Sequence, residues 1–144
     1  MAVSVQENVQ LVQRFWDEVW TQGNLTATDD IVSTDFVLYT PQGQKNGAEG
    51  LKQWVTSIRS AAPDIQFIVD DTISEGNKVV TSWRGTGTNS GSFLGRPPTN
   101  KALAMTGISI FRIENGKIKA EWLTENTWEL LQQLGMATLK QNMD

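Results

Sequence analysis

The sequence predicts an α+β protein in which N-terminal helices pack on one face of a strongly curved antiparallel sheet. Apolar residues recur at helical spacing through the first 62 residues, whereas alternating, strand-like segments fill most of residues 65–125. Asn115-Gly116, the strongest hairpin signal in the chain, joins the last two of these segments. Because separate runs of helices and hairpin-linked strands characterise α+β domains, residues 1–144 are predicted to form a single domain.

Each expected helix has a start or stop signal. Ser4 and Glu7 form a capping box before the first apolar stripe, and Pro63 prevents continuation of the third helix. Asn126 and Glu129 have the same capping-box spacing at the start of the last expected helix. The expected helices cover residues 5–20, 26–32, 46–62 and 128–134.

The expected strands are separated by turn-forming residues. A loop rich in Gly, Pro and Asn spans residues 87–100, and Gly107 indicates a bulge or bend inside the longest strand. The expected strands cover residues 36–40, 65–73, 79–86, 102–113 and 117–125.

Composition excludes several kinds of chemistry. The 144 residues include neither His nor Cys, so imidazole bases, catalytic triads, thiolate nucleophiles and thiolate zinc sites are ruled out. Twelve Lys and Arg against sixteen Asp and Glu give a net charge of −4, which argues against nucleic-acid binding. The segment MAVSVQENVQ resembles no signal peptide, and no apolar run would span a membrane. We therefore expect a cytoplasmic protein without a metal or cofactor, and with neither nucleic acid nor membrane as a partner.

Alternation along residues 117–126 assigns two faces to the last strand. One face is predicted to be exposed to solvent and carries Lys117, Lys119, Glu121, Leu123 and Glu125. The other face is predicted to look inward and carries Ile118, Ala120, Trp122, Thr124 and Asn126. On this interpretation the two glutamates are poor candidates for buried acid–base chemistry.

Six tryptophans are many for this length, and two interpretations stay open. The indoles either fill the core or line a pocket for a flat apolar ligand, since ligand pockets are mostly apolar with a few polar groups. The residues predicted to contact such a ligand are Phe15, Trp16, Trp20, Trp54, Trp83, Phe93, Ile110, Trp122 and Thr124.

Five segments, in order along the chain, resemble the SnoaL-like polyketide (ester) cyclase family of the nuclear transport factor 2-like (NTF2-like) superfamily. They are FWDEVWTQGN, STDFVLYTP, GTNSGSFLGRPPTNK, GISIFRIENGKIKAEW and ELLQQLG. The resemblance implies a cone-shaped α+β barrel with a deep apolar pocket, often a homodimer through the open sheet face. It also implies ring closure by intramolecular aldol condensation of a small apolar or polycyclic carbonyl compound without a cofactor, using a pocket Asp.

The chain departs from this family pattern at three positions. The family Asp follows the last-strand Trp by four residues, and that position is Asn126 here. Asparagine transfers no proton at neutral pH, although it can hydrogen-bond an enolate oxygen, and it can also act purely as a helix cap. Many relatives carry His at the positions of Tyr39 and Asn89, so both imidazoles are replaced as well.

The residues predicted to carry any chemistry are therefore Asn126, Tyr39 and Asp71. Asp71 shares a predicted apolar face with Phe67, Val69 and Ile73, which favours a raised pKa, but it also lies near a turn. Tyr39 can donate a hydrogen bond to a carbonyl or pack as a strand aromatic. A cyclase or isomerase with an altered acid–base site is one hypothesis. The alternative is a non-catalytic ligand-binding or dimeric accessory protein that has lost the catalytic Asp.

Overall fold

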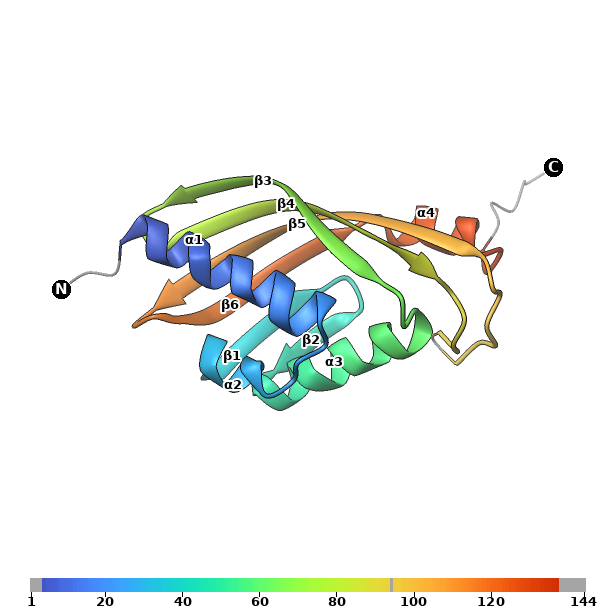
Figure 1. Ribbon diagram of the computed structural model, residues 1–144, viewed down its shortest axis with the longest axis horizontal. Coiled ribbons are helices and arrows are strands. Elements are labelled where there is room, and N and C mark those ends of the chain that lie inside the picture. Colours follow the sequence, from blue (N-terminus) through green and yellow to red (C-terminus); the bar gives the residue numbers. More distant parts are fainter. Residues whose placement is uncertain (1–3, 94, 138–144) are drawn as a thin grey trace, which may run out of the picture.

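A computed structural model of the protein describes residues 4–93 and 95–137. Residues 1–3 lie outside these ranges, and they are part of the segment MAVSVQENVQ for which no signal peptide is predicted. A curved six-stranded sheet arches over a layer of helices (Figure 1). The predicted α+β class is confirmed. The helices are α1 (Val5–Arg14), the π-helical segment η1 (Phe15–Thr21), α2 (Ala27–Ile31), α3 (Gly47–Ala61) and α4 (Thr127–Gln133).

The sheet has the strand order β2-β1-β6-β5-β4-β3. Strands β3 to β6 form the expected antiparallel meander, but β1 pairs with β6 in parallel, so the sheet is mixed. The short β2 was not predicted, because its sequence GQKN has no apolar alternation. The strands are β1 (Val32–Thr40), β2 (Gly43–Asn46), β3 (Gln66–Glu75), β4 (Lys78–Thr88), β5 (Ala102–Glu114) and β6 (Lys117–Glu125).

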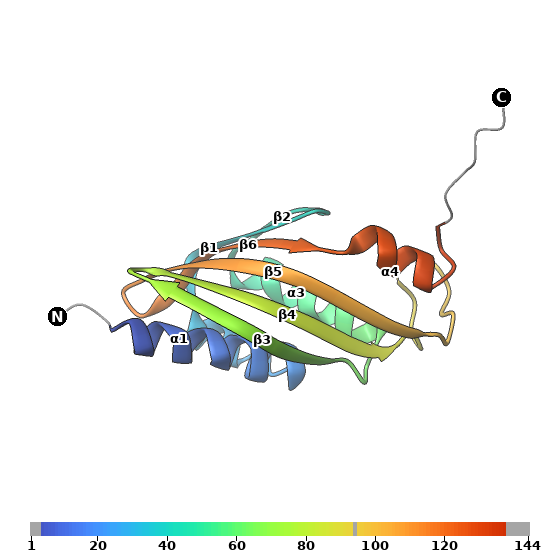
Figure 2. The same ribbon diagram turned by 90° about the horizontal axis from the view of Figure 1, so that it is seen from above.

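The helices cover one face of the sheet only. Helix α1 and η1 pack against β3 and β4, and α3 packs against β1. Seen from above, the other face is bare along most of its length, and α4 lies at one end beyond β6 (Figure 2). The Ser4 hydroxyl accepts a hydrogen bond from the Glu7 backbone N–H at 3.1 Å, as the predicted capping box requires. Within the described ranges, no helix is long and apolar enough to cross a membrane.

The hydrophobic core lies between the sheet and the helices. Phe15, Phe36, Leu51 and Phe111 are fully buried there. The Phe15 and Phe111 rings meet edge-on with centroids 5.3 Å apart, a favourable aromatic geometry. This contact fixes the helix layer against the sheet.

One β-bulge interrupts β6. Arg112 of β5 pairs with Ala120, but the next residue, Ile113, pairs with Ile118, so Lys119 is an extra residue in β6. Because side chains alternate with a period of two, one extra residue exchanges the faces of everything that follows it. Ile118 faces inward before the bulge, and Glu121 faces inward after it.

A second bulge interrupts β3. Val69 pairs with Trp83 and Asp71 pairs with Ser82, which leaves Asp70 as the extra residue. The residues after it are therefore shifted to the opposite face, and Ile73 is 64% exposed. The predicted apolar face shared by Asp71 with Phe67 and Val69 is wrong for this reason.

Candidate functional site

The predicted orientation of the last strand is correct for Ile118 and Ala120 but wrong from Glu121 onward, because the bulge at Lys119 reverses it. The Glu121 side chain is only 1% exposed, whereas Trp122 is 40% exposed on the outer face of the sheet. Leu123 is buried and Glu125 is half-buried on the same inner face as Glu121. The strand that was predicted to present a polar face to solvent thus directs two carboxyl groups toward the helices.

Burial dominates the chemistry of Glu121. Removing a carboxylate from water disfavours its charged form, and burial raises the pKa of Glu121 to about 8. The nearby Ser109 hydroxyl lowers this pKa and the charge of Glu125 raises it, but both effects are smaller than that of burial. At neutral pH the Glu121 carboxyl group therefore keeps its proton and is able to donate it.

Glu121 and Glu125 line one cavity between the sheet and the helices. The free volume of this cavity is about 20 Å³, about the space that one water molecule needs. Apart from the two carboxyl groups its walls are mainly aromatic or aliphatic. They are formed by Trp16, Trp20, Trp54, Ile58, Phe67, Trp83, Met105, Glu121, Leu123 and Glu125.

The indole N–H groups around this cavity differ in their partners. Trp16 Nε1 donates to Thr81 Oγ1 at 3.2 Å, and Trp83 Nε1 donates to Ser109 Oγ at 3.0 Å. Trp20 Nε1 and Glu121 Oε1 are buried and have no hydrogen-bond partner among the residues that the structure describes. Since buried polar atoms are nearly always paired, these two atoms are unusual.

Glu125 is the more exposed of the two carboxyl groups and lies two inward positions further along β6, beyond Leu123. Its Oε1 accepts a hydrogen bond from the Thr127 hydroxyl at 3.4 Å. Burial raises the pKa of Glu125, while hydrogen bonds from Thr127 and Gln42 lower it. The two carboxyl groups of the cavity therefore have different surroundings, and the more exposed Glu125 is the better candidate for the ionised partner.

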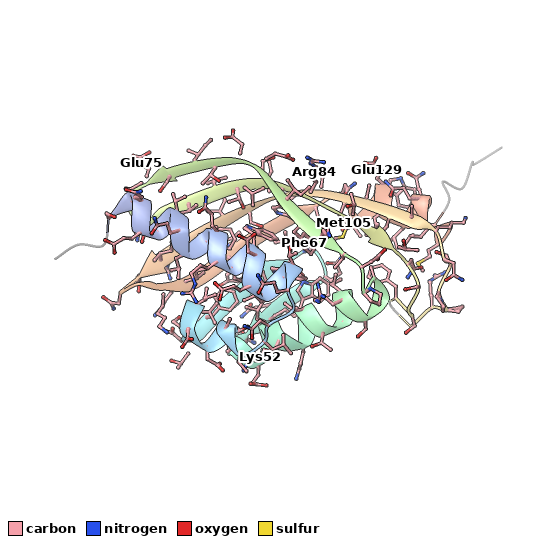
Figure 3. The ribbon with its side chains drawn as sticks, viewed as in Figure 1. Lys52, Phe67, Glu75, Arg84, Met105 and Glu129 are labelled. Atoms are coloured by element: carbon pink, nitrogen blue, oxygen red, sulfur yellow. The ribbon has the colours of Figure 1, made fainter. Side chains whose placement is uncertain are left out.

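A second cavity of about 20 Å³ lies next to the first. Both cavities are lined by Ile58 and Met105, so these two side chains form the wall between them. Figure 3 shows Phe67 and Met105 pointing from the sheet toward the helices, whereas Arg84 lies on the opposite side of the sheet. The second cavity is lined by Ile58, Ala61, Ala62, Ile65, Asn89, Phe93, Leu103, Met105, Leu130 and Leu134.

The residues predicted to contact a ligand are divided between the two sides of the sheet. Trp16, Trp20, Trp54 and Trp83 line the first cavity and Phe93 lines the second, whereas Phe15 belongs to the packed core. The predicted inward positions of three further residues are wrong, because all three lie exposed on the outer face: Ile110, Trp122 and Thr124.

The residues predicted to carry chemistry also lie outside both cavities. Tyr39 stacks on Trp122 on the outer face, with ring centroids 5.4 Å apart and an interplanar angle of 11°. Asp71 is exposed and accepts a hydrogen bond from the Thr72 backbone N–H at 2.9 Å. The structure thus brings neither residue to the cavity.

Asn126 borders an open groove on the outer face of the sheet, which shares Trp83 and Glu125 with the first cavity. Its Oδ1 accepts the Thr106 N–H at 2.9 Å and its Nδ2 donates to Glu129 at 3.2 Å. It stands at the N-cap position of α4 but its side chain caps no N–H of that helix, so this part of the predicted capping box is wrong. The Asn126 side chain instead extends the hydrogen bonding between β5 and β6.

Sequence reasoning missed Glu121 and Glu125. The signal that was available is the apolar pair Trp122-Leu123, which breaks strict alternation and is what a bulge upstream would produce.

No group of three or more acidic side chains that could hold a metal ion occurs in residues 4–93 and 95–137.

The fold and the cavity together define a class of protein: an α+β protein with an internal, aromatic-walled cavity that holds buried carboxyl groups. Residues 10–134 match the family model of the SnoaL-like polyketide cyclases, and the chain belongs to this family. None of the curated proteins with which the chain was compared gives a significant match.

Solved structures agree with this assignment. A Bacillus cereus ATCC 10987 protein described as a polyketide cyclase is 30% identical, with a TM-score of 0.79 over 92% of this chain and 83% of that one. A Jannaschia sp. CCS1 protein described as a SnoaL-like polyketide cyclase has a TM-score of 0.86 at 20% identity, over 96% and 99% of the two chains. An NTF2-like protein from Burkholderia xenovorans LB400 shares the fold at 16% identity and a TM-score of 0.72, over 91% and 98%.

Proposed function

We propose that the protein is a cofactor-independent acid–base enzyme that enolises an apolar carbonyl compound, as a cyclase or an isomerase. The observation that carries the proposal is the pair of carboxyl groups, Glu121 and Glu125, at inward positions of β6 on either side of Leu123, in one mainly apolar cavity. Two carboxyl groups held in different surroundings are the arrangement that lets one act as an acid and the other as a base. Membership of the polyketide cyclase family supports this class of reaction.

The proton transfers are assigned by burial. Glu125, as the carboxylate, takes a proton from the carbon next to the carbonyl group, and the C–H electron pair becomes the C=C bond of the enol. The π pair of the carbonyl group moves to its oxygen, which receives the proton of Glu121. Glu125 then gives its proton to another carbon of a conjugated enol, and Glu121 takes back the enol O–H proton as the C=O bond is restored, which completes an isomerisation.

Ring closure uses the same two groups and needs no oxidant or reductant. The enol carbon attacks a second carbonyl carbon of the same molecule, and a C–C bond forms. Glu121 takes back the enol proton as the first C=O bond is restored, and Glu125 protonates the new alkoxide. All atoms of the substrate are retained, as in an intramolecular aldol addition.

A ligand larger than a few atoms requires the cavity to expand. Met105 and Ile58 separate the two cavities, and a methionine side chain adapts its conformation more easily than most apolar residues. Rotation of Met105 would join the two spaces into one apolar chamber. We infer that the reactive carbonyl group lies near Glu121 and that the rest of the molecule extends toward Phe93.

Proton exchange at carbon tests this function without knowledge of the natural substrate. Acetophenone, 2-tetralone and a 1,3-diketone are incubated with the protein in D₂O, and loss of their α-proton NMR signals is followed. We expect exchange faster than in buffer, and a loss of about 10²-fold or more in Glu121→Gln and in Glu125→Gln. Glu129→Gln, which changes an exposed carboxylate on α4, is the matched control. Exchange that is equally fast in Glu121→Gln would contradict the assignment.

The non-catalytic alternative makes a distinct prediction in the same experiment. A protein that only binds a ligand gives thermal stabilisation by one of the ketones with no exchange in any variant. The raised pKa of Glu121 favours the enzyme, because a simple apolar binding site has no need for a buried acid.

We also propose that the bare face of the sheet packs against a second copy of the chain. Tyr39, Ile108, Ile110 and Trp122 form a flat apolar patch on that face, each at least 39% exposed. Such a patch is self-complementary across a two-fold axis, and adjacent exposed apolar residues of this size mark interaction surfaces. Light scattering is expected to give the mass of two chains for the native protein and one chain for Ile110→Lys. A native mass of one chain at high concentration would contradict the dimer.

A further inference from the structure

Two polar atoms of the cavity are left without protein partners. Trp20 is 5% exposed and Glu121 is 1% exposed, and Trp20 Nε1 and Glu121 Oε1 find no partner among residues 4–93 and 95–137. Both side chains line the same cavity, which has room for about one water-sized group. A ligand atom placed in that space therefore lies against both side chains.

Two neighbouring indoles differ from Trp20 because their N–H groups are paired within the protein. Trp16 and Trp83 line the same cavity, and each donates its N–H to a hydroxyl group of the sheet, Thr81 and Ser109 respectively. Of the four indoles that line the cavity, two thus have hydroxyl acceptors in the sheet, and Trp20 has a buried N–H group that is left free to serve a ligand. A buried donor without a partner destabilises the folded protein, so a ligand that pairs with this donor gains binding affinity.

We propose that Trp20 Nε1 and the Glu121 carboxyl group together bind one oxygen atom of the ligand, the carbonyl oxygen at which negative charge develops. An indole N–H can only donate, and a protonated carboxyl group can donate as well. Two donors directed at one oxygen stabilise an enolate more than the neutral ketone, because the negative charge accepts stronger hydrogen bonds.

The inference narrows the ligand class. The ligand must carry a carbonyl or enolate oxygen flanked by apolar, planar groups, since the surrounding walls are formed by Trp16, Trp54, Phe67 and Trp83. A hydrocarbon of the same shape leaves both donors unpaired and binds less well. The inference rests on the proposed use of this cavity as the ligand site, but it does not require that the protein catalyses a reaction.

Two ligands of equal shape test this inference. Acetophenone and α-methylstyrene differ only in having C=O or C=CH₂ at the same place. Their dissociation constants are measured by NMR titration at about pH 6, where Glu121 is protonated. We expect the native protein to prefer acetophenone by about tenfold. We also expect the Trp20 indole N–H signal to move downfield with acetophenone only.

Variants distinguish loss of the two donors from general destabilisation of the protein. Trp20→Phe and Glu121→Met each lower the preference for acetophenone several-fold, whereas Glu121→Gln keeps much of it because an amide still donates. Trp128→Phe is the matched control: it removes the N–H of an exposed indole on α4 that lines neither cavity, so the preference is unchanged. Circular dichroism verifies that each variant is folded.

The outcomes distinguish this inference from the proposed function. Equal affinity of the native protein for the two compounds, no binding of either, or a full preference in Trp20→Phe would overturn the inference. A preference for acetophenone without α-proton exchange supports the inference and contradicts the enzyme. Exchange that is lost in Glu121→Gln while Trp20→Phe keeps both its preference and its rate supports the enzyme and overturns the inference.

Discussion

Glu121 pairs directly with Phe111 across strands β6 and β5, so a carboxyl group shares the inner face of the sheet with a fully buried phenyl ring. The folded protein therefore holds the proton of Glu121 more tightly than the unfolded chain, with a pKa raised from 4.5 to about 8. Between these two values the folded state is protonated and the unfolded state is ionised. Stability is fully present below the lower value and decreases as the pH rises through this window.

The first prediction is that the unfolding free energy falls by up to about 1.4 kcal/mol per pH unit within this window because of Glu121. Glu121→Gln removes this dependence and is more stable than the native protein at about pH 9. Urea unfolding followed at several pH values measures both effects. The raised pKa of Glu125 acts in the same direction, so Glu125→Gln is the comparison variant. A native protein as stable at about pH 9 as at pH 5 would contradict the buried, protonated state.

Glu121 also shows how far the site could be predicted from the sequence. Helical periodicity and hairpin signals suffice to predict the α+β class and most elements, because each depends on local patterns such as the Ser4 cap and the Asn115-Gly116 turn. Which face of β6 looks inward depends instead on the bulge at Lys119. A bulge of this kind is fixed by pairing with β5 and β1, and its one local sign, the apolar pair Trp122-Leu123, does not say which residue is the extra one. The four indoles of the first cavity could be predicted, whereas its two carboxyl groups could not.

The second prediction concerns this bulge. Deletion of Lys119 restores regular alternation, so residues on one side of the deletion must change face. Either Ile118 turns outward, or Glu121 and Leu123 do. Because both sets are buried, we expect loss of cooperative unfolding in circular dichroism. Lys119→Ala keeps the extra residue and removes only a partly exposed side chain that pairs with Asp35 and Glu114, so it is expected to unfold cooperatively. A deletion variant as stable as Lys119→Ala would show that the bulge does not set the orientation.

The third prediction compares two indoles of the cavity. Trp16→Phe leaves the buried Thr81 hydroxyl without its donor, and we expect a loss of about 1–3 kcal/mol in unfolding free energy beyond the change in ring size. Trp20→Phe removes an N–H that has no partner in the described part of the chain, so the loss from the smaller ring is partly offset because an unpaired buried donor is removed. Chemical denaturation of both variants measures the difference. An equal loss in the two variants would indicate that Trp20 Nε1 is hydrogen-bonded in the folded protein.

The fourth prediction concerns the outer face. Trp122 packs on Tyr39 but is 40% exposed, whereas Trp83 is 3% exposed in the core. Truncating a buried tryptophan costs about 3–5 kcal/mol, so Trp83→Ala is expected to be severely destabilised in denaturant unfolding. Trp122→Ala is expected to cost much less at low protein concentration, because the stack with Tyr39 contributes only about 0.5–1.5 kcal/mol beyond the buried area.

Protein concentration then separates packing within one chain from packing between two chains. If Trp122 lies in a dimer interface, the native midpoint of unfolding rises with concentration by mass action, and the difference between the native protein and Trp122→Ala grows with it. A difference that stays constant from low to high concentration would place the Tyr39–Trp122 stack on the surface of a monomer. In either case Trp122→Ala retains the affinity for acetophenone, because the outer face and the Glu121 cavity lie on opposite sides of the sheet.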